Sequence, residues 1–125
     1  MQTLTSIARI LLGLIFVTFG ANGFLHFLPQ PPVPSAAQAF FGALAATGYL
    51  LPLLFLTEIT AGALLLVGVV PLALVLLAPV IVNIVGFHVF LAPGGLPLAA
   101  VVAALEVFLA WTRREAFAPL FGAGS

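Results

Sequence analysis

Four long apolar runs dominate the pattern of hydrophobic and polar positions along this chain. They extend over about residues 4–27, 51–69, 72–91 and 97–112, and each is rich in Leu, Ile, Val, Phe and Ala. A helix needs about 20 apolar residues to cross the hydrocarbon core of a bilayer. The pattern therefore predicts four transmembrane helices.

Prolines separate the first apolar run from the second. The stretch LPQPPVP, residues 28–34, should end the first helix, because proline lacks a backbone donor and disfavours helical conformation in the residue before it. Ser35 and Gln38 then have the spacing of a capping box, in which Ser35 is the N-cap and Gln38 reaches back. We expect a short helix over about residues 36–47, either lying at the membrane interface or re-entering it.

The segment from residue 36 to residue 70 is too long for one straight crossing of about 20 residues. We divide it at Gly48, which should stop the short helix, and at Pro52, a residue suited to the first turn of a helix. One long, tilted helix is the alternative. The expected fold is an all-α integral membrane four-helix bundle, a single transmembrane domain with a short extra helix between the first and second crossings.

Composition supports a membrane protein. The chain of 125 residues is 64% hydrophobic and 5% charged, with no lysine, aspartate or cysteine, whereas about a quarter of a soluble domain is charged. Its partner is therefore the lipid bilayer, and the net charge of zero gives no reason to expect nucleic acid. Without cysteine, a redox role would need a bound cofactor or another subunit.

The three arginines predict the orientation. Arg9 lies near the start of the first crossing, and Arg113 and Arg114 follow the last. Four crossings put both termini on one side, and the positive-inside rule makes that side cytoplasmic. We expect the inner (cytoplasmic) membrane of a bacterium, with Trp111 at the interface beside the last two arginines.

Six polar side chains at or within the crossings are the candidate functional residues: Asn22, His26, Glu58, Asn83, His88 and Glu106. Counting inward from the outer helix ends, at about 1.5 Å per residue, places the asparagines and glutamates roughly 8–14 Å deep. The two histidines lie nearer the outer boundary. We therefore predict one shared polar cluster in the outer half of the bilayer.

Helical spacing supports this cluster. Thr18, Asn22 and His26 are four residues apart and should form one stripe on the first helix. Glycines mark roughly the opposite face, where another helix can approach closely: Gly13, Gly20 and Gly23.

Both glutamates are expected on faces that contact other helices. Gly62 lies one turn from Glu58, and Glu106 stands in a stripe of alanines. An ionised carboxylate at mid-membrane costs at least about 2.5–3.5 kcal/mol, and no cation lies near either glutamate in the predicted arrangement. We expect both carboxyls to be protonated.

Two explanations of the polar set stay open. Hydrogen bonds among its members would hold the bundle together, at about 0.6 kcal/mol each, or the set would bind a ligand or relay protons. No metal cluster is predicted. His26 and His88 could still be axial ligands of a haem or a chlorophyll-type pigment, although interfacial histidines also make ordinary hydrogen bonds.

Several short segments, in their order and spacing, resemble the DoxX-like membrane proteins. They are Arg9 with LLGLIF (residues 11–16), FGANG (19–23), TEITAG (57–62), PVIVN (79–83) with His88, and LEVFLAW (105–111). The resemblance covers nearly the whole chain and implies a compact four-helix membrane bundle. Relatives that serve disulfide chemistry are no guide, because this chain has no cysteine.

The small size, short loops and nearly uncharged surface favour a non-catalytic subunit, or an assembly or stabilising factor, of a larger membrane complex. We therefore expect other membrane subunits as partners. The resemblance implies an electron-transfer setting, because the family name comes from a subunit associated with a quinone-linked thiosulfate oxidoreductase. Two alternatives stay open: a quinone-binding redox module, and a pigment- or haem-binding accessory subunit of a photosynthetic or respiratory complex.

Overall fold

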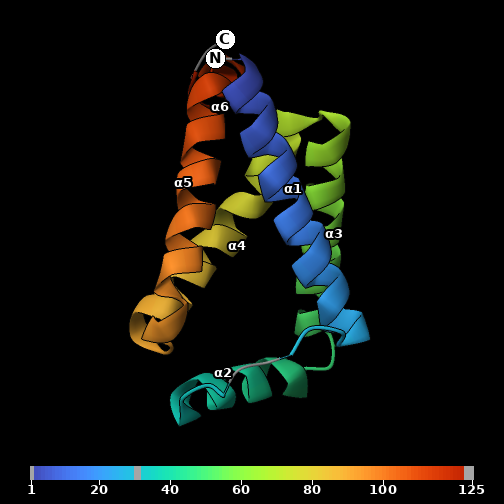
Figure 1. The fold of residues 1–125 in the computed structure, drawn as a ribbon, viewed down its shortest axis with the longest axis vertical. Coiled ribbons are helices and arrows are strands. Elements are labelled where there is room, and N and C mark those ends of the chain that lie inside the picture. The colour runs from blue at the N-terminus through green and yellow to red at the C-terminus, as the bar shows by residue number, and fades with distance from the viewer. Residues whose placement is uncertain (1, 30–31, 123–125) are drawn as a thin grey trace.

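The computed structural model describes residues 2–29 and 32–122, and in these residues all regular structure is helical (Figure 1). The helices are α1 (Gln2–Leu25), α2 (Ser35–Ala46), α3 (Leu50–Val67), α4 (Val70–Phe90), the 3-10 turn η1 (Pro93–Gly95), α5 (Leu96–Thr112) and α6 (Arg114–Phe121). The bounds of the first five α-helices differ from the predicted bounds by no more than two residues.

Four helices of the described chain, α1, α3, α4 and α5 with η1, are long and apolar enough to cross a membrane. They form a ring in which α1 packs on α3, α3 on α4, α4 on α5 and α5 on α1. Large apolar side chains such as Leu14, Val82 and Val107 are exposed on the outside of this ring, where a bilayer would contact them. The predicted all-α membrane bundle is confirmed.

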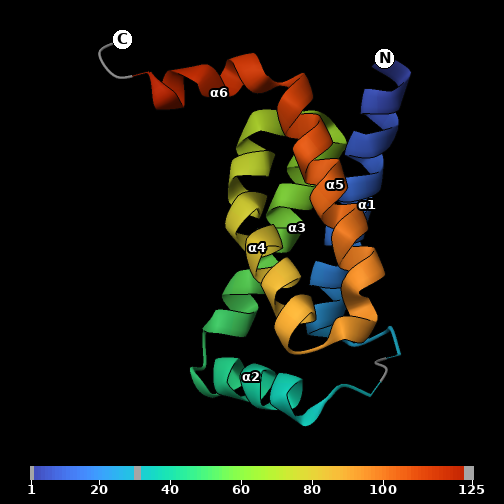
Figure 2. The same ribbon diagram turned by 90° about the vertical axis from the view of Figure 1, so that its left-hand side faces the viewer.

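Two helices lie across the ends of the ring (Figure 2). Helix α2 covers the end where α1 stops and α3 begins, and α6 extends outward from the other end, away from the start of α1 (Figure 2). Phe40 and Phe41 of α2 pack against Phe87 of α4 with tilted rings. The ring centroids of Phe40 and Phe41 lie 5.7 and 5.0 Å from that of Phe87. The alternative of one long helix is wrong, because the chain turns at Gly48, whose φ is 80°.

The predicted capping box of α2 does not form. Pro34 occupies the N-cap position, and its carbonyl accepts the first helical bond from Gln38 N at 3.0 Å. Ser35 therefore lies inside the first turn, and no side chain caps this helix. The Gln38 side chain does reach back, but it donates to the Val33 carbonyl at 3.0 Å.

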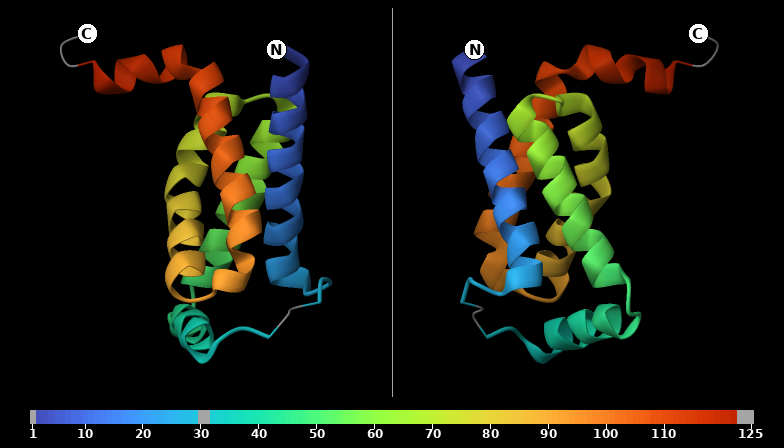
Figure 3. Two further views of the ribbon diagram at one scale, coloured as in Figure 1. Left: turned by 60° about the vertical axis from the view of Figure 1, so that its left-hand side comes forward. Right: turned by 90° about the vertical axis from the view of Figure 1, so that its right-hand side faces the viewer.

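The closest helix contact joins the backbones of α1 and α3, which run side by side (Figure 3). A Cβ atom placed on Gly62 would lie 2.8 Å from the Gly13 carbonyl oxygen, and one placed on Gly13 would lie 3.0 Å from the Gly62 carbonyl oxygen. Near the other end of the contact, a Cβ on Gly20 would lie 2.9 Å from the Phe55 carbonyl oxygen. The predicted glycine face of the first helix is confirmed.

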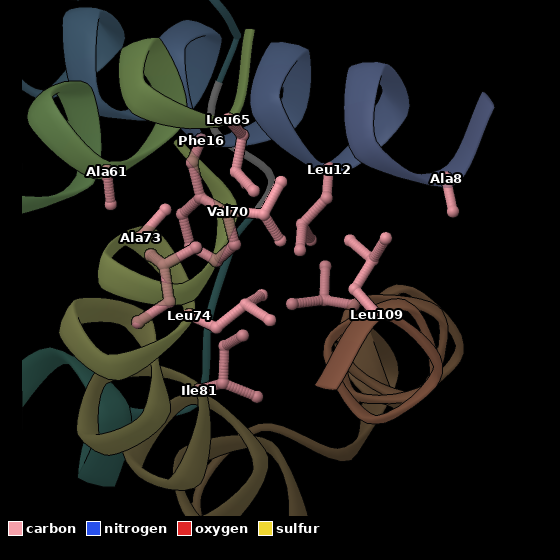
Figure 4. Close-up of a cluster of buried hydrophobic side chains, with 12 residues drawn as sticks. Ala8, Leu12, Phe16, Ala61, Leu65, Val70, Ala73, Leu74, Ile81 and Leu109 are labelled. Carbon is pink, nitrogen blue, oxygen red and sulfur yellow. The ribbon is translucent and has the colours of Figure 1, made fainter. Parts of the chain in front are cut away.

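Apolar side chains from all four spanning helices fill the ring (Figure 4). Leu12 and Phe16 of α1 meet Leu65 of α3, Leu74 of α4 and Leu109 of α5, and each of the five is at most 2% exposed. The core is therefore continuous across the bundle.

Arg9 joins α1 to the end of α3. Its guanidinium Nη1 donates to the carbonyl oxygens of Leu65 and Leu66 at 2.5 and 2.9 Å. The last carbonyls of a helix have no partner within it and carry partial negative charge. Arg9 supplies the donor for the Leu66 carbonyl and a second donor for the Leu65 carbonyl, which also accepts from the Gly68 amide at 3.2 Å. The sequence pattern did not indicate this role.

Substituting Gly62 by alanine should destabilise the bundle. The added methyl group meets backbone atoms of α1, so the two helices must separate, and we expect a loss of about 1–3 kcal/mol. Unfolding with a denaturing detergent measures this change. Gly42→Ala in α2 is the control, because a Cβ there meets nothing within 4 Å; equal stability of the two variants would contradict the close contact.

Substituting Arg9 by methionine should also destabilise the bundle, because the Leu66 carbonyl then loses its donor and the Leu65 carbonyl keeps only the Gly68 amide. We expect a cost of about 1.5–3 kcal/mol, typical of hydrogen bonds to charged groups. Arg113→Met provides the control, since that side chain is exposed. If both variants unfold at the same detergent concentration as the wild type, the Arg9 bonds do not stabilise the fold.

Candidate functional site

Asn22 closes the turn at the end of α1. Its side chain is 4% exposed, and its Oδ1 accepts a hydrogen bond from the Leu28 amide at 2.7 Å. Its backbone carbonyl accepts another from the His26 amide at 2.8 Å. Asn22 therefore has a local structural partner.

His26 is exposed and adopts a left-handed backbone conformation, with φ of 53°. This conformation ends the helix, so His26 no longer continues the helical spacing of Thr18 and Asn22. Thr18 itself is exposed whereas Asn22 is buried. The predicted stripe of these three residues is wrong, because the residues face different surroundings.

His88 is tied to its own helix and to the next turn. Its Nδ1 lies 2.9 Å from the Ile84 carbonyl oxygen, and its ring meets that of Phe87 edge to face. A Cβ placed on Gly95 would overlap the His88 ring at Nε2. Gly95 therefore lies against the His88 ring beside Nε2, the nitrogen with which His88 would bind a haem or pigment as an axial ligand.

Metal ligands do not gather in the described residues, where no group of three or more His, Cys, Asp or Glu side chains could hold an ion. The two histidines lie near the same end of the bundle, on the turn after α1 and on the last turn of α4. His26 is exposed, whereas His88 is half-buried and its ring lies between Phe87 and Gly95.

Glu58 lies on the inner face of α3, one turn from Gly62, and is 8% exposed. Its carboxyl makes no hydrogen bond in residues 2–29 and 32–122. The predicted position on a helix-contact face is correct.

Glu106 lines a groove between α4 and α5. The groove has a volume of about 330 Å³ and is otherwise apolar, and it is lined by Ala78, Ile81, Val82, Val85, Ala103, Glu106 and Val107. Several of these side chains are exposed on the outside of the ring, so the groove opens outward. Oε1 of Glu106 is enclosed and has no hydrogen-bond partner in the described chain.

Asn83 is exposed on the outer side of α4. It makes no hydrogen bond within the described residues. It is the one asparagine of the predicted set that the fold turns away from the core.

The predicted shared cluster does not form within one chain. No hydrogen bond joins any two of the six candidate side chains in the parts that the structure describes. The depths along the helices converge, but the helices turn these groups in different directions. Asn22 bonds to its own loop, His88 to its own helix, and Asn83 faces outward.

Comparison with family models, with curated proteins and with solved structures finds no match for this chain. The resemblance to DoxX-like proteins stays a prediction from the sequence.

The α4–α5 groove is the feature that sequence patterns missed. One signal for it was present: Ala99, Ala103, Glu106 and Ala110 share a small-residue face of α5. That face leaves room beside the carboxyl. The sequence did not indicate that this space beside Glu106 would open on the outside of the ring.

Substituting Asn22 by leucine should destabilise the protein, because the Leu28 amide then loses its acceptor. We expect a cost of about 1–3 kcal/mol, measured by detergent-induced unfolding. His26→Gly should leave stability unchanged or raise it by up to about 1 kcal/mol, since glycine adopts the left-handed conformation without steric cost. An unchanged Asn22→Leu variant would contradict the role of Asn22 in the turn.

Proposed function

We propose that this protein is a non-catalytic accessory subunit that packs against transmembrane helices of a larger membrane complex. The observation that supports this function best is the Glu106 carboxyl, which makes no hydrogen bond in the described residues and lines a groove that opens outward. Within hydrocarbon, each polar group without a partner costs several kcal/mol, because no water is present to satisfy it.

Asn83 adds a second polar group on the same pair of helices. Its exposed amide would face lipid tails in an isolated chain. Polar side chains in transmembrane helices commonly hydrogen-bond across helices. A partner that packs on the outer surface of α4 and α5 would meet the Asn83 amide on one flank of α4 and the Glu106 carboxyl in the groove on the other.

The setting of the complex rests on other observations. The resemblance to DoxX-like proteins supports an electron-transfer complex. The three arginines lie toward the end of the bundle where α1 begins and α6 extends. With the positive-inside rule, this supports cytoplasmic termini in a bacterial inner membrane.

Quinone binding is a second candidate, and the same groove supports it. Its volume of about 330 Å³ is at the lower end of the range for small-molecule sites, about 300–1,000 Å³, which are mostly apolar with a few polar groups. A protonated Glu106 would donate to a quinone carbonyl oxygen.

Isolation of tagged protein from its native membranes in mild detergent tests the proposal. Other membrane subunits should accompany the wild type. Glu106→Leu should reduce their yield by about tenfold or more, because the partner group is left unsatisfied at a cost of about 1–3 kcal/mol. Glu106→Gln keeps a donor and an acceptor and should retain them.

Glu115→Gln is the control, since that carboxyl is exposed on α6, outside the spanning helices. Mass spectrometry of proteins and extracted lipids reads the outcome. An isoprenoid quinone in place of any other subunit would support the second candidate and contradict the first. A chain isolated with neither would overturn both.

A further inference from the structure

On the outer face of α4, Asn83 lies on one side and the α4–α5 groove lies on the other. Successive helical residues are turned by about 100°, so Asn83 points nearly opposite to the buried Ile81. By the same rule, Gly86 lies between Asn83 and Val82, a residue of the groove. Gly86 is half-buried, and a Cβ placed on it would meet no atom of another helix within 4 Å, so there is space beside it at the centre of the face.

Asn83 and Glu106 also lie at nearly the same depth in the membrane. The residues of α4 that line the groove centre on Ile81 and Val82, and those of α5 centre on Glu106. Val82 immediately precedes Asn83, a rise of about 1.5 Å along the helix. Asn83 and Glu106 therefore lie at nearly the same depth. Asn83 is on one side of α4, and the groove that holds Glu106 is on the other.

We infer that a second copy of this chain packs on the outer face of α4, with Asn83 of each copy hydrogen-bonded to Glu106 of the other. Rotation about a two-fold axis along the membrane normal leaves the depth of every residue unchanged. Asn83 of one copy and Glu106 of the other therefore lie at nearly the same depth. When two α4 helices contact near Gly86, the Asn83 flank of one lies beside the groove of the other. Both contacts form together.

The chemistry of the two groups is complementary. A carboxamide offers two donors and an acceptor, and a protonated carboxyl offers one donor and acceptors. The small residue at the centre allows the two backbones to approach closely. The inference rests on the proposed function, in which this surface docks another helix. It identifies that helix as α4 of a second copy, so that other subunits bind the dimer and not the single chain.

Cysteine cross-linking tests the dimer, because the natural chain has no cysteine. Two differently tagged copies of Gly86→Cys are expressed together in membranes and oxidised. The expected product is a covalent dimer that carries both tags. Leu53→Cys is the control: it is exposed on α3, lies at a similar distance from the same end of the bundle, and should stay monomeric.

Three further variants in the Gly86→Cys background test the hydrogen bonds. Asn83→Leu or Glu106→Leu should reduce the cross-linked fraction by about tenfold or more. The exchange Asn83→Glu with Glu106→Asn in one chain keeps the pair and should restore it. Absence of the cross-link in Gly86→Cys, together with a native mass of one 12.9 kDa chain for the wild type in lipid nanodiscs, would overturn the inference.

The results separate this inference from the proposed function. Other subunits isolated with a chain that does not cross-link would support the accessory role and overturn the dimer. A cross-linked dimer isolated without other subunits would support the dimer and overturn the accessory role.

Discussion

Hydrocarbon offers no hydrogen bonds, and the structure depends on that constraint. Its spanning segments are helices, which satisfy their own backbones. Several polar side chains also bond to nearby backbone: Thr57 to the Leu53 carbonyl, Thr112 to the Leu109 carbonyl and Asn22 to the Leu28 amide. Against this background, three side chains without a hydrogen bond in the described residues are informative: Glu58, Asn83 and Glu106. Glu58 is buried among the helices, whereas Asn83 and the Glu106 groove lie toward the outside of the ring.

Properties of single helices could be predicted from the sequence. The length of an apolar run determines whether a helix can span the membrane, and length and proline positions alone were enough to identify the four spans. The glycines at 13, 20 and 62 indicated a close helix contact, because few other features explain three glycines within apolar helices. The structure places all three at the α1–α3 contact.

Directions around the helices could not be predicted in the same way. Counting residues gives the depth of a side chain in the membrane. Whether that side chain faces the core or the outside depends on where the neighbouring helices pack. Asn83 shares a depth with Glu106 and yet faces outward. Pro34, and not Ser35, is the N-cap of α2. Its carbonyl accepts the first helical bond from the Gln38 amide, and Ser35 is already part of the helix. Such outcomes depend on the whole fold.

The Arg9 contact has a consequence for biosynthesis. Its acceptor at Leu65 lies 56 residues later in the chain, so α1 leaves the ribosome with a charge whose final partners have not yet been made. Until α3 is synthesised, that charge must remain among water and lipid head groups. Completion of α3 then supplies the carbonyls that draw Arg9 in, so the depth of the first helix is settled only when the third helix arrives.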